Sequence, residues 1–277
     1  MSVRKSLTLL ALLMCAPFAA ASAAVEPEPS CVQRADYSYA SERVRVSIDR
    51  VEEPELVYFV ADIQLASPDG LRTALSHDRT EGALERLSDM ARRNGAVLAV
   101  NADNYRSNGS GIIIRNGELL RARSSTRALL IADAEGNLSV KAERKGEKPR
   151  ALAGELLAQG VRQTFEFGPE LVRDGQEVEP AKGFRLISTR DTVREPRTAI
   201  GQIGPLHYIV IVADGRREGY SLGMTLPDLR RLMVEYGAHT AMNLDGGGST
   251  GLYFAGELIN RPSGKRERGL SDILLFR

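Results

Sequence analysis

One stretch near the C-terminal end constrains the fold and the chemistry of this chain more than any other: Met242-Asn243-Leu244-Asp245-Gly246-Gly247-Gly248-Ser249-Thr250. The apolar runs on either side, His239–Leu244 and Gly251–Phe254, predict two short buried strands, so Asp245 is expected at a sharp turn. Three glycines permit positive φ and let a ligand touch the backbone, and successive amides can form an anion-binding nest. The alternative is an ordinary turn capped by its aspartate. The two hydroxyl residues after the glycines favour a binding site, and no nucleotide-binding glycine motif fits.

The N-terminal segment predicts export from the cytoplasm. Met1–Ala24 combines two basic residues with a short apolar run and a small-residue end, as a secretory signal peptide does. We therefore expect the mature protein to begin near Val25 and to be periplasmic or secreted. No later segment approaches the roughly 18 apolar residues of a spanning helix, so stable membrane insertion is not expected. A flexible leader is predicted over residues 25–43.

The composition argues against several classes of partner. Lys and Arg number 37 against 36 Asp and Glu, so binding along nucleic acid or to an anionic membrane is not expected. Cys15 leaves with the signal peptide, and Cys31 alone cannot form an internal disulfide. The chain has no Trp and only 5% aromatic residues, which favours a compact polar pocket over an extended sugar-stacking groove.

Short strand-like runs punctuated by turn residues dominate the rest of the chain. We predict one α+β domain over residues 44–277, built on a large mixed, mostly antiparallel sheet system with a few helices. The expected strands are Val44–Ile48, Leu56–Leu65, Ala96–Val100, Gly111–Ile114, Ala128–Ala132, Thr198–Ile203, His207–Val212, His239–Leu244, Gly251–Phe254 and Ser271–Phe276.

Two segments have helical periodicity. Glu81–Arg93 places Leu84, Leu87 and Ala91 on one face. Leu226–Tyr236, which follows a Thr225 cap and precedes Gly237, places Leu229, Leu232, Met233 and Tyr236 inward. Three other segments predict tight hairpins, whose turns contain residue pairs that tolerate positive φ. They lie at residues 114–119, 172–177 and 254–258.

Polar residues also follow or open other apolar strands. Taken singly, each aspartate fits an Asx-turn and each arginine a solvated surface position. Together with Asp245 they favour one site on one rim of the fold, where strand ends meet. The candidates are Asn101, Asp103, Arg197, Asp214, Arg216, Asn260 and Arg268.

In these residues the chain resembles the phosphodiester glycosidase domain family, which includes the catalytic domain of the mannose 6-phosphate uncovering enzyme and many bacterial secreted proteins. The resemblance extends from about Val44 to Phe276, and the stretch from Asn243 to Thr250 is its strongest part. One block departs from the family pattern: this chain has Asn101-Ala102-Asp103-Asn104-Tyr105 where the family usually has Asn, a small residue, Gly and two aromatics. We expect Asp103 to alter the substrate or to add a charge to the site. Further matching blocks are Gly168-Pro169-Glu170-Leu171-Val172, Arg197-Thr198-Ala199-Ile200-Gly201, Asp214-Gly215-Arg216, Asn260-Arg261-Pro262-Ser263 and Glu267-Arg268-Gly269-Leu270-Ser271-Asp272.

The resemblance implies hydrolysis of a sugar joined through its anomeric oxygen to a phosphodiester, in a phosphate-linked glycan or a small molecule, without a required cofactor. A phosphate leaving group is already a stable anion, so charge neutralisation matters more than a general acid. Asp245 or Asp214 is expected to act as nucleophile or as base. The expected substrate-binding residues are Asn101, Asp103, Arg197, Arg216, Asn243, Gly246, Gly247, Gly248, Ser249, Asn260 and Arg268.

Two other functions stay open from the sequence. Asp103, Asp214 and Asp245, with Asn101 and Asn243, are oxygen donors of the kind that calcium or magnesium takes, which would fit a metal-dependent phosphodiester hydrolase. The three histidines have no zinc-type spacing. The second alternative is a non-catalytic polysaccharide-binding or envelope-assembly protein on the same fold, which the altered block at residues 101–105 keeps open.

Overall fold

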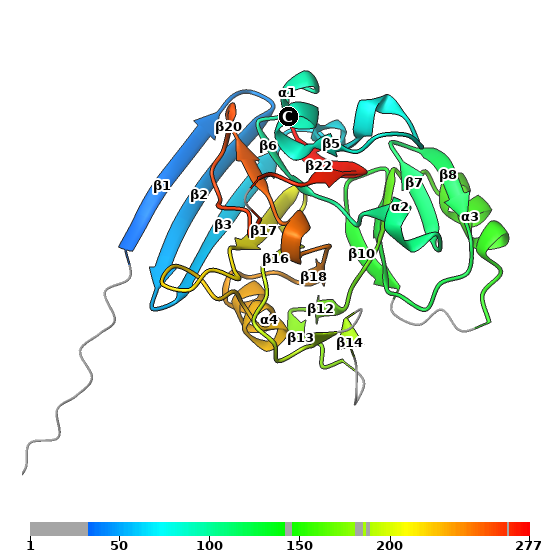
Figure 1. The fold of residues 1–277 in the computed structure, drawn as a ribbon. Helices are drawn as coiled ribbons and strands as arrows, with labels where there is room; N and C mark the ends of the chain where they lie inside the picture. Colours follow the sequence, from blue (N-terminus) through cyan, green and yellow to red (C-terminus); the bar gives the residue numbers. More distant parts are fainter. Residues whose placement is uncertain (1–32, 142–145, 181–184, 187–188, 265) are drawn as a thin grey trace, which may run out of the picture. The chain divides into compact units, whose positions relative to one another are not determined.

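The largest sheet in the computed structural model has eight strands, all paired antiparallel. The structure describes residues 33–141, 146–180, 185–186, 189–264 and 266–277. Figure 1 shows the first three strands side by side. In spatial order the strands are β1 (Gln33–Ala40), β2 (Val44–Glu53), β3 (Leu56–Leu65), β17 (His207–Ala213), β16 (Arg197–Gly204), β18 (Thr240–Asn243), β12 (Glu170–Arg173) and β13 (Gln176–Glu177).

Strand β1 changes the expected domain start. Residues 33–40 are predicted to be part of a flexible leader. In the structure, every one of these residues pairs with β2. The predicted signal peptide and Cys31 lie outside the described residues. The expected strand Val44–Ile48 likewise continues to Glu53, because its pairing with β3 runs to the turn at residue 55.

A second, five-stranded antiparallel sheet packs against the first. The main core lies between them, with Phe59 and Val210 from the large sheet against Leu98 and Leu274 from the small one. Burying each such side chain contributes about 1.5–3 kcal/mol. In spatial order the strands are β20 (Glu257–Leu258), β19 (Leu252–Phe254), β6 (Leu98–Asn101), β22 (Asp272–Phe276) and β4 (Leu71–Leu75).

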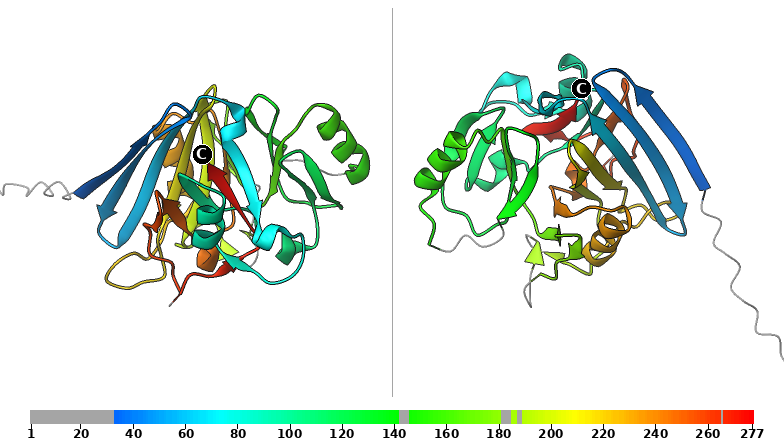
Figure 2. Two further views of the ribbon diagram at one scale, coloured as in Figure 1. Left: turned by 90° about the horizontal axis from the view of Figure 1, so that it is seen from above. Right: turned by 180° about the vertical axis from the view of Figure 1, so that it is seen from behind.

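Helix α4 (Leu226–Glu235) covers the other face of the large sheet, where Leu229 and Met233 join a second core cluster. It begins as predicted: Asp228 N donates to Thr225 Oγ1 at 3.2 Å, and Gly237 follows the helix with a φ of 81°. Figure 2 shows this helix from two further directions.

Helix α1 (Leu87–Arg93) is shorter than the predicted Glu81–Arg93. Residues Glu85–Arg86 form β5 and pair with β21 (Gly269–Leu270), so the chain ahead of the helix is extended. Leu84, which was assigned to the apolar face of the helix, is 50% exposed. Tertiary pairing with a distant strand therefore overrides the local helical pattern.

Most of the remaining elements form a lobe beside the two sheets, visible in green in Figure 1. Its helix α3 (Pro149–Ala158) was not predicted, because only Ala153 and Leu156 of its residues are buried and the apolar stripe is weak. The lobe also contains α2 (Tyr105–Asn108), β7 (Ile112–Arg115), β8 (Glu118–Ala122), β9 (Leu129–Ala132), β10 (Leu138–Lys141) and β11 (Gln163–Glu166). Outside the lobe, β14 (Arg185–Leu186) pairs with β15 (Thr189–Arg190), and 3-10 turns lie at Pro68–Gly70, Ser76–Asp78 and Gly247–Ser249.

The three predicted hairpins are confirmed as β7–β8, β12–β13 and β19–β20. Their turn residues have positive φ: 51° and 85° at Asn116-Gly117, and 50° and 76° at Asp174-Gly175. The fold class is also as predicted, an α+β domain dominated by antiparallel sheets. No helix among the described residues is long and apolar enough to cross a membrane.

Candidate functional site

The strand register brings several predicted residues to one edge of the large sheet. Arg197, which opens β16, lies opposite Ala213, which ends β17, and Ala199 lies opposite Asn243, which ends β18. Asp214 and Asp245 therefore leave the sheet at the same edge. Asn101 reaches that edge from β6 of the smaller sheet.

Asp245 is the carboxylate at the centre of this edge. Its residue is 8% exposed, and Oδ1 accepts a hydrogen bond from Gly246 N at 2.9 Å. Its Oδ2 is buried and has no hydrogen-bond partner. Burial raises the pKa of Asp245, while Ser249, the Gly246 amide and Arg268 act in the opposite direction. An enclosed carboxylate oxygen without a partner is a feature of a binding or catalytic site.

Three other buried polar atoms in the same stretch have no hydrogen-bond partner: Ser249 Oγ, Thr250 Oγ1 and Asn243 Oδ1. Ser249 lies close enough to Asp245 to lower the pKa of its carboxyl, yet the geometry between them falls short of a direct hydrogen bond. An unpaired buried polar group costs about 1–3 kcal/mol. Four such atoms within eight residues indicate a place where a polar ligand or water completes the structure.

The glycine turn fits closely against its neighbours but offers fewer free amides than expected. A Cβ on Gly246 would lie 2.6 Å from Pro196 O, and Gly247 has a φ of 59°. The amides of Gly246, Gly247 and Ser249 already donate to Asp245 Oδ1, Pro196 O and Gly246 O. Within the described residues only the Gly248 amide of this turn is uncommitted. The expected row of anion-binding amides is therefore reduced to one donor.

Two of the predicted arginines lie beside the turn. Arg216 Nε donates to Glu195 Oε2 at 2.5 Å, and its Nη2 would be 3.1 Å from a Cβ on Gly247. Arg268 is exposed, its Nη1 would be 3.5 Å from a Cβ on Gly248, and no carboxylate among the described residues pairs with it. Both guanidinium groups are therefore placed next to the turn that carries Asp245.

A third arginine, Arg127, was missed by the sequence reasoning. Its guanidinium lies 5.3 Å from the ring centre of Phe167, and Nη1 is buried without a hydrogen-bond partner. Burial lowers the pKa of Arg127, against the opposing charges of Asp103 and Asp245. The only signal available was an arginine directly before the apolar strand Ala128–Ala132, a position like that of Arg197.

Arg197 itself is turned inward. It is 3% exposed, and Nε and Nη2 donate to Met224 O at 3.1 Å and Val193 O at 3.0 Å. Burial lowers the pKa of Arg197 to about 10. These bonds hold the segment ahead of β16 against the segment ahead of α4, so two of the five N–H donors of Arg197 are engaged by the backbone.

Asp214 and Asn260 form a closed structural network. Asp214 Oδ1 accepts from Asn260 Nδ2 at 2.9 Å, and Oδ2 accepts from Tyr220 OH at 2.8 Å and from Arg261 N at 2.9 Å. Asn260 Oδ1 in turn accepts from Leu252 N at 2.7 Å. Burial raises the pKa of Asp214. This carboxylate lies at the predicted edge but has both oxygens engaged by the protein.

The two asparagines mainly fix backbone. Asn101 Oδ1 accepts from Thr198 Oγ1 at 2.7 Å, and Asn243 Nδ2 donates to Gly168 O at 2.8 Å. Only Asn243 Oδ1 remains open to a sugar hydroxyl. Both residues were expected to bind substrate, and the geometry favours a positioning role for Asn101.

Asp103 lies in a buried ionic cluster and not beside Asp245 as a ligand-facing charge. Its Oδ1 pairs with Arg115 Nη2 at 2.6 Å, Oδ2 accepts from Glu166 N at 2.7 Å, and Asp272 Oδ2 lies 2.7 Å from the same Arg115 Nη2. Burial raises the pKa of Asp103 to about 7. The expectation that Asp103 adds a charge directly to the substrate site is therefore wrong, because Arg115 and the Glu166 amide engage its oxygens.

The donor set does not converge on a metal. Asp103 and Asp214 have their oxygens committed to protein donors, so they cannot join Asp245 as ligands without rearrangement. In the part of the chain that the structure describes, no group of three His, Cys, Asp or Glu side chains is arranged to hold a metal ion.

A family model for phosphodiester glycosidase matches residues 94–277, which contain every residue of this candidate site. The chain belongs to the phosphodiester glycosidase family. A curated relative, the uncharacterized protein YomE from the SPbeta prophage of Bacillus subtilis, is 32% identical over 198 residues, which cover 69% of this chain and 29% of YomE. The chain thus spans less than a third of that relative's length.

Solved structures share the fold. The zebrafish N-acetylglucosamine-1-phosphodiester alpha-N-acetylglucosaminidase catalytic domain, auto-inhibited by its pro-peptide, aligns with a TM-score of 0.63 at 21% identity, covering 91% of this chain and 84% of that one. A hypothetical protein from Synechocystis aligns with a TM-score of 0.63 at 17% identity, covering 90% and 64%. At these identities the likeness establishes a phosphodiester glycosidase fold for this chain.

Proposed function

We propose that this protein hydrolyses the bond between the anomeric carbon of a sugar and a phosphodiester oxygen, releasing the free sugar and a phosphomonoester. The observation that carries the proposal is the environment of Asp245. One of its oxygens is buried and unpaired, and the guanidinium groups of Arg127, Arg216 and Arg268 gather around it and the adjoining turn. Membership of the phosphodiester glycosidase family supports the same reaction class.

The residues suit a phosphate leaving group. When the glycosidic bond breaks, the bonding electrons go to the phosphate oxygen, which is a stable anion and needs little help from a general acid. The arginines neutralise the two charges of the departing phosphomonoester, because guanidinium groups bind phosphate oxygens in bidentate fashion. Asp245 acts either as nucleophile at the anomeric carbon or as base on an attacking water.

Asp245 is the better of the two carboxylates that the sequence nominated. Asp214 accepts hydrogen bonds on both oxygens, so attack through it would break Asn260 and Tyr220 contacts. Asp272, the carboxylate that shares Arg115 with Asp103, likewise accepts from Ser271 Oγ at 2.9 Å. We therefore assign Asp214 to positioning of the loop that carries Arg216, and Asn101 to positioning of Asp245.

The test is a panel of sugar-1-phosphodiesters incubated with purified protein, with and without a chelator, and with products identified by mass and NMR. Hydrolysis that survives the chelator and is lost in Asp245→Asn supports the glycosidase. Hydrolysis abolished by the chelator supports the metal-dependent alternative. Tight glycan binding without turnover supports a non-catalytic polysaccharide-binding protein.

The substrate and its location follow from the same reasoning. A phosphate-linked glycan of the cell envelope or an exopolysaccharide fits both the reaction and the predicted signal peptide at Met1–Ala24. We infer that the mature protein, beginning near Val25, acts in the periplasm or outside the cell. N-terminal sequencing of the exported protein tests this, and a retained Met1 would contradict it.

A further inference from the structure

Strand β8 and helix α3 form a basic groove outside the Asp245 site. The groove has a volume of about 500 Å³ and is lined by residues 119–123 together with Arg150 from the first turn of α3. Three of these residues are arginines, Arg121, Arg123 and Arg150, and none is acidic. No carboxylate among the described residues forms an ion pair with any of the three. Arg121 Nη2 donates to Tyr105 O at 2.7 Å, whereas Arg123 and Arg150 are exposed. A groove with three arginines and no acidic lining residue attracts anions.

Two partly buried arginines connect this groove with the Asp245 site. Arg121 lies in the groove and its Nε is buried without a hydrogen-bond partner, as is Arg127 Nη1 beside Phe167. An extended chain advances at most about 3.6 Å per residue, so the Cα atoms of Arg121 and Arg127, six steps apart, are separated by no more than about 22 Å. The groove and the candidate site therefore lie near enough for one extended anionic ligand to reach Arg127 and the arginines of the groove.

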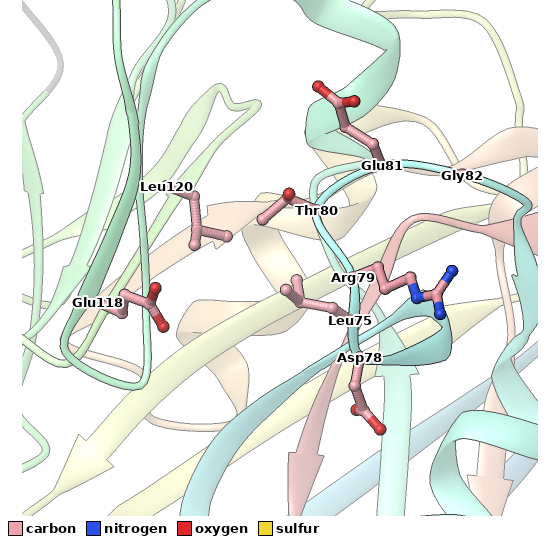
Figure 3. A pocket seen from close by; sticks show the side chains of 8 residues that line it. All are labelled: Leu75, Asp78, Arg79, Thr80, Glu81, Gly82, Glu118 and Leu120. Atoms are coloured by element: carbon pink, nitrogen blue, oxygen red, sulfur yellow. The ribbon is translucent and has the colours of Figure 1, made fainter.

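A second cavity, which β8 also lines, has the opposite character. It has a volume of about 600 Å³, and Figure 3 shows Glu118 and Leu120 of β8 across from the loop that carries Thr80 and Glu81. Its lining includes three carboxylates, Asp78 among them, and one arginine. An anionic ligand that follows β8 is therefore favoured on the Arg121 side and disfavoured here.

We propose that the basic groove binds further phosphate groups of an aglycone that is itself a phosphodiester-linked oligomer, so that the Asp245 site acts on a sugar attached to a polyanionic chain. This inference rests on the proposed hydrolysis and names its substrate class. Arg123 and Arg150 contact phosphates beyond the reacting one. Leu119, which is 40% exposed, offers apolar contact to the carbons between them.

The first test measures binding without turnover. The probes are an oligomer of four glycerols joined by three phosphodiesters, and two glycerols joined by a single phosphodiester. In 50 mM salt the wild type is expected to bind the oligomer at least about 10-fold more tightly, because several exposed charge contacts add and counterions are released. The double variant Arg123→Ala/Arg150→Ala is expected to lose about 5- to 20-fold of oligomer affinity and to leave the weak binding of the single phosphodiester unchanged.

The matched control is Arg92→Ala/Arg231→Ala, which removes the same charge from exposed helix positions that each pair with an aspartate three residues away. It is expected to retain oligomer affinity. Thermal unfolding confirms that both double variants are folded. An equal loss in both doubles, an oligomer bound no more tightly than the single phosphodiester, or equal affinity for an uncharged glycan of the same length would overturn the proposal.

A turnover measurement separates this inference from the proposed function. With the sugar found in the activity panel, Arg123→Ala/Arg150→Ala is expected to lower kcat/KM on an oligomer-linked sugar and to leave a methyl-phosphodiester of that sugar unaffected. Oligomer binding that depends on the groove, with no turnover of any sugar, would contradict the proposed hydrolysis and support phosphate binding by the groove. Turnover that does not depend on aglycone length would support the proposed hydrolysis and contradict phosphate binding by the groove.

Discussion

Asn101 Nδ2 donates a hydrogen bond to the backbone carbonyl of Asp245 at 2.5 Å, and this bond ties the end of β6 in the small sheet to the turn after β18 in the large one. The oxygen of the same side chain, Asn101 Oδ1, accepts hydrogen bonds from Thr198 Oγ1 and from Gly251 N. The backbone on both sides of the glycine turn is thereby fixed by one buried side chain. The position of Asp245, whose Oδ2 is buried and unpaired, is therefore fixed through its main chain from both sheets.

The first prediction separates the two nominated aspartates. Asp245→Asn keeps the shape of the turn and removes the charge, so kcat should fall by roughly 100-fold or more with KM little altered. The free energy of unfolding should not fall, because the substitution removes a charge that burial disfavours, as the raised pKa of Asp245 indicates. A folded Asp245→Asn protein with nearly full activity would show that the wrong residue has been assigned.

Asp214→Asn is the matched control for that variant. Its new amide nitrogen would face donors such as Tyr220 OH or Arg261 N, so one buried hydrogen bond is lost. This loss should lower the free energy of unfolding by about 1–3 kcal/mol. The melting temperature should drop and kcat should fall less than in Asp245→Asn. Steady-state kinetics and thermal unfolding on the same preparations measure both effects.

The second prediction concerns the arginines. Arg127→Ala, Arg216→Ala and Arg268→Ala should each raise KM and lower kcat/KM for a sugar-1-phosphodiester by about 10- to 100-fold, since each removes a charge-assisted contact of about 1.5–3 kcal/mol. The loss should be much smaller on a nitrophenyl glycoside, whose leaving group is not a dianion. Arg92→Ala, in an exposed pair with Asp89, serves as the control. Equal losses on both kinds of substrate would mean that these arginines do not contact the phosphate.

The third prediction uses two neighbouring glycines. Gly247 has a φ of 59° and a Cβ there would lie 3.1 Å from Arg216 Nη2, so Gly247→Ala should cost about 1–2 kcal/mol of stability and displace that arginine. Gly248 has no left-handed φ, and its nearest neighbour, Arg268 Nη1, is at an ordinary 3.5 Å. Gly248→Ala should therefore be tolerated. If the two variants have the same KM and melting temperature, the close fit between the turn and Arg216 is not functional.

The fourth prediction is a pH dependence of stability. Burial raises the pKa of Asp103 to about 7, well above the value of about 4 in an unfolded chain. Between these values the folded state holds a proton that the unfolded state has released, so this residue makes stability fall as pH rises from about 4 to 7. Asp103→Asn should remove that part of the slope. An unchanged pH profile of the unfolding free energy would show that Asp103 stays ionised beside Arg115.

The sequence predicted those features that depend on local chemistry. The Asn116-Gly117 and Asp174-Gly175 turns and the Thr225 cap were found because their backbone needs are set by neighbours in the chain. The start of α1 and the strand at residues 33–40 were missed, since both depend on pairing with distant strands. Helix α3 has too weak an apolar face to be recognised.

For the candidate site, the sequence located the strand ends but not the direction of each side chain. Asp103, Arg197 and Asp214 are at the expected edge, and all three point into the protein toward partners from other segments. Arg127, which interacts electrostatically with Asp103 and Asp245, lies at the start of an expected strand and was missed, because a single arginine before an apolar run is not a distinctive sequence signal. Only tertiary structure decides which polar residue at a strand end remains open to a ligand.

The most direct test of the proposed reaction is hydrolysis of a sugar-1-phosphodiester in ¹⁸O-enriched water. The account predicts that the bond between the anomeric carbon and oxygen breaks, so the heavy oxygen appears on C1 of the released sugar and the phosphomonoester contains none. Label in the phosphate instead would mean that the P–O bond is cleaved, as in a phosphodiester hydrolase, and would contradict the role assigned to Asp245.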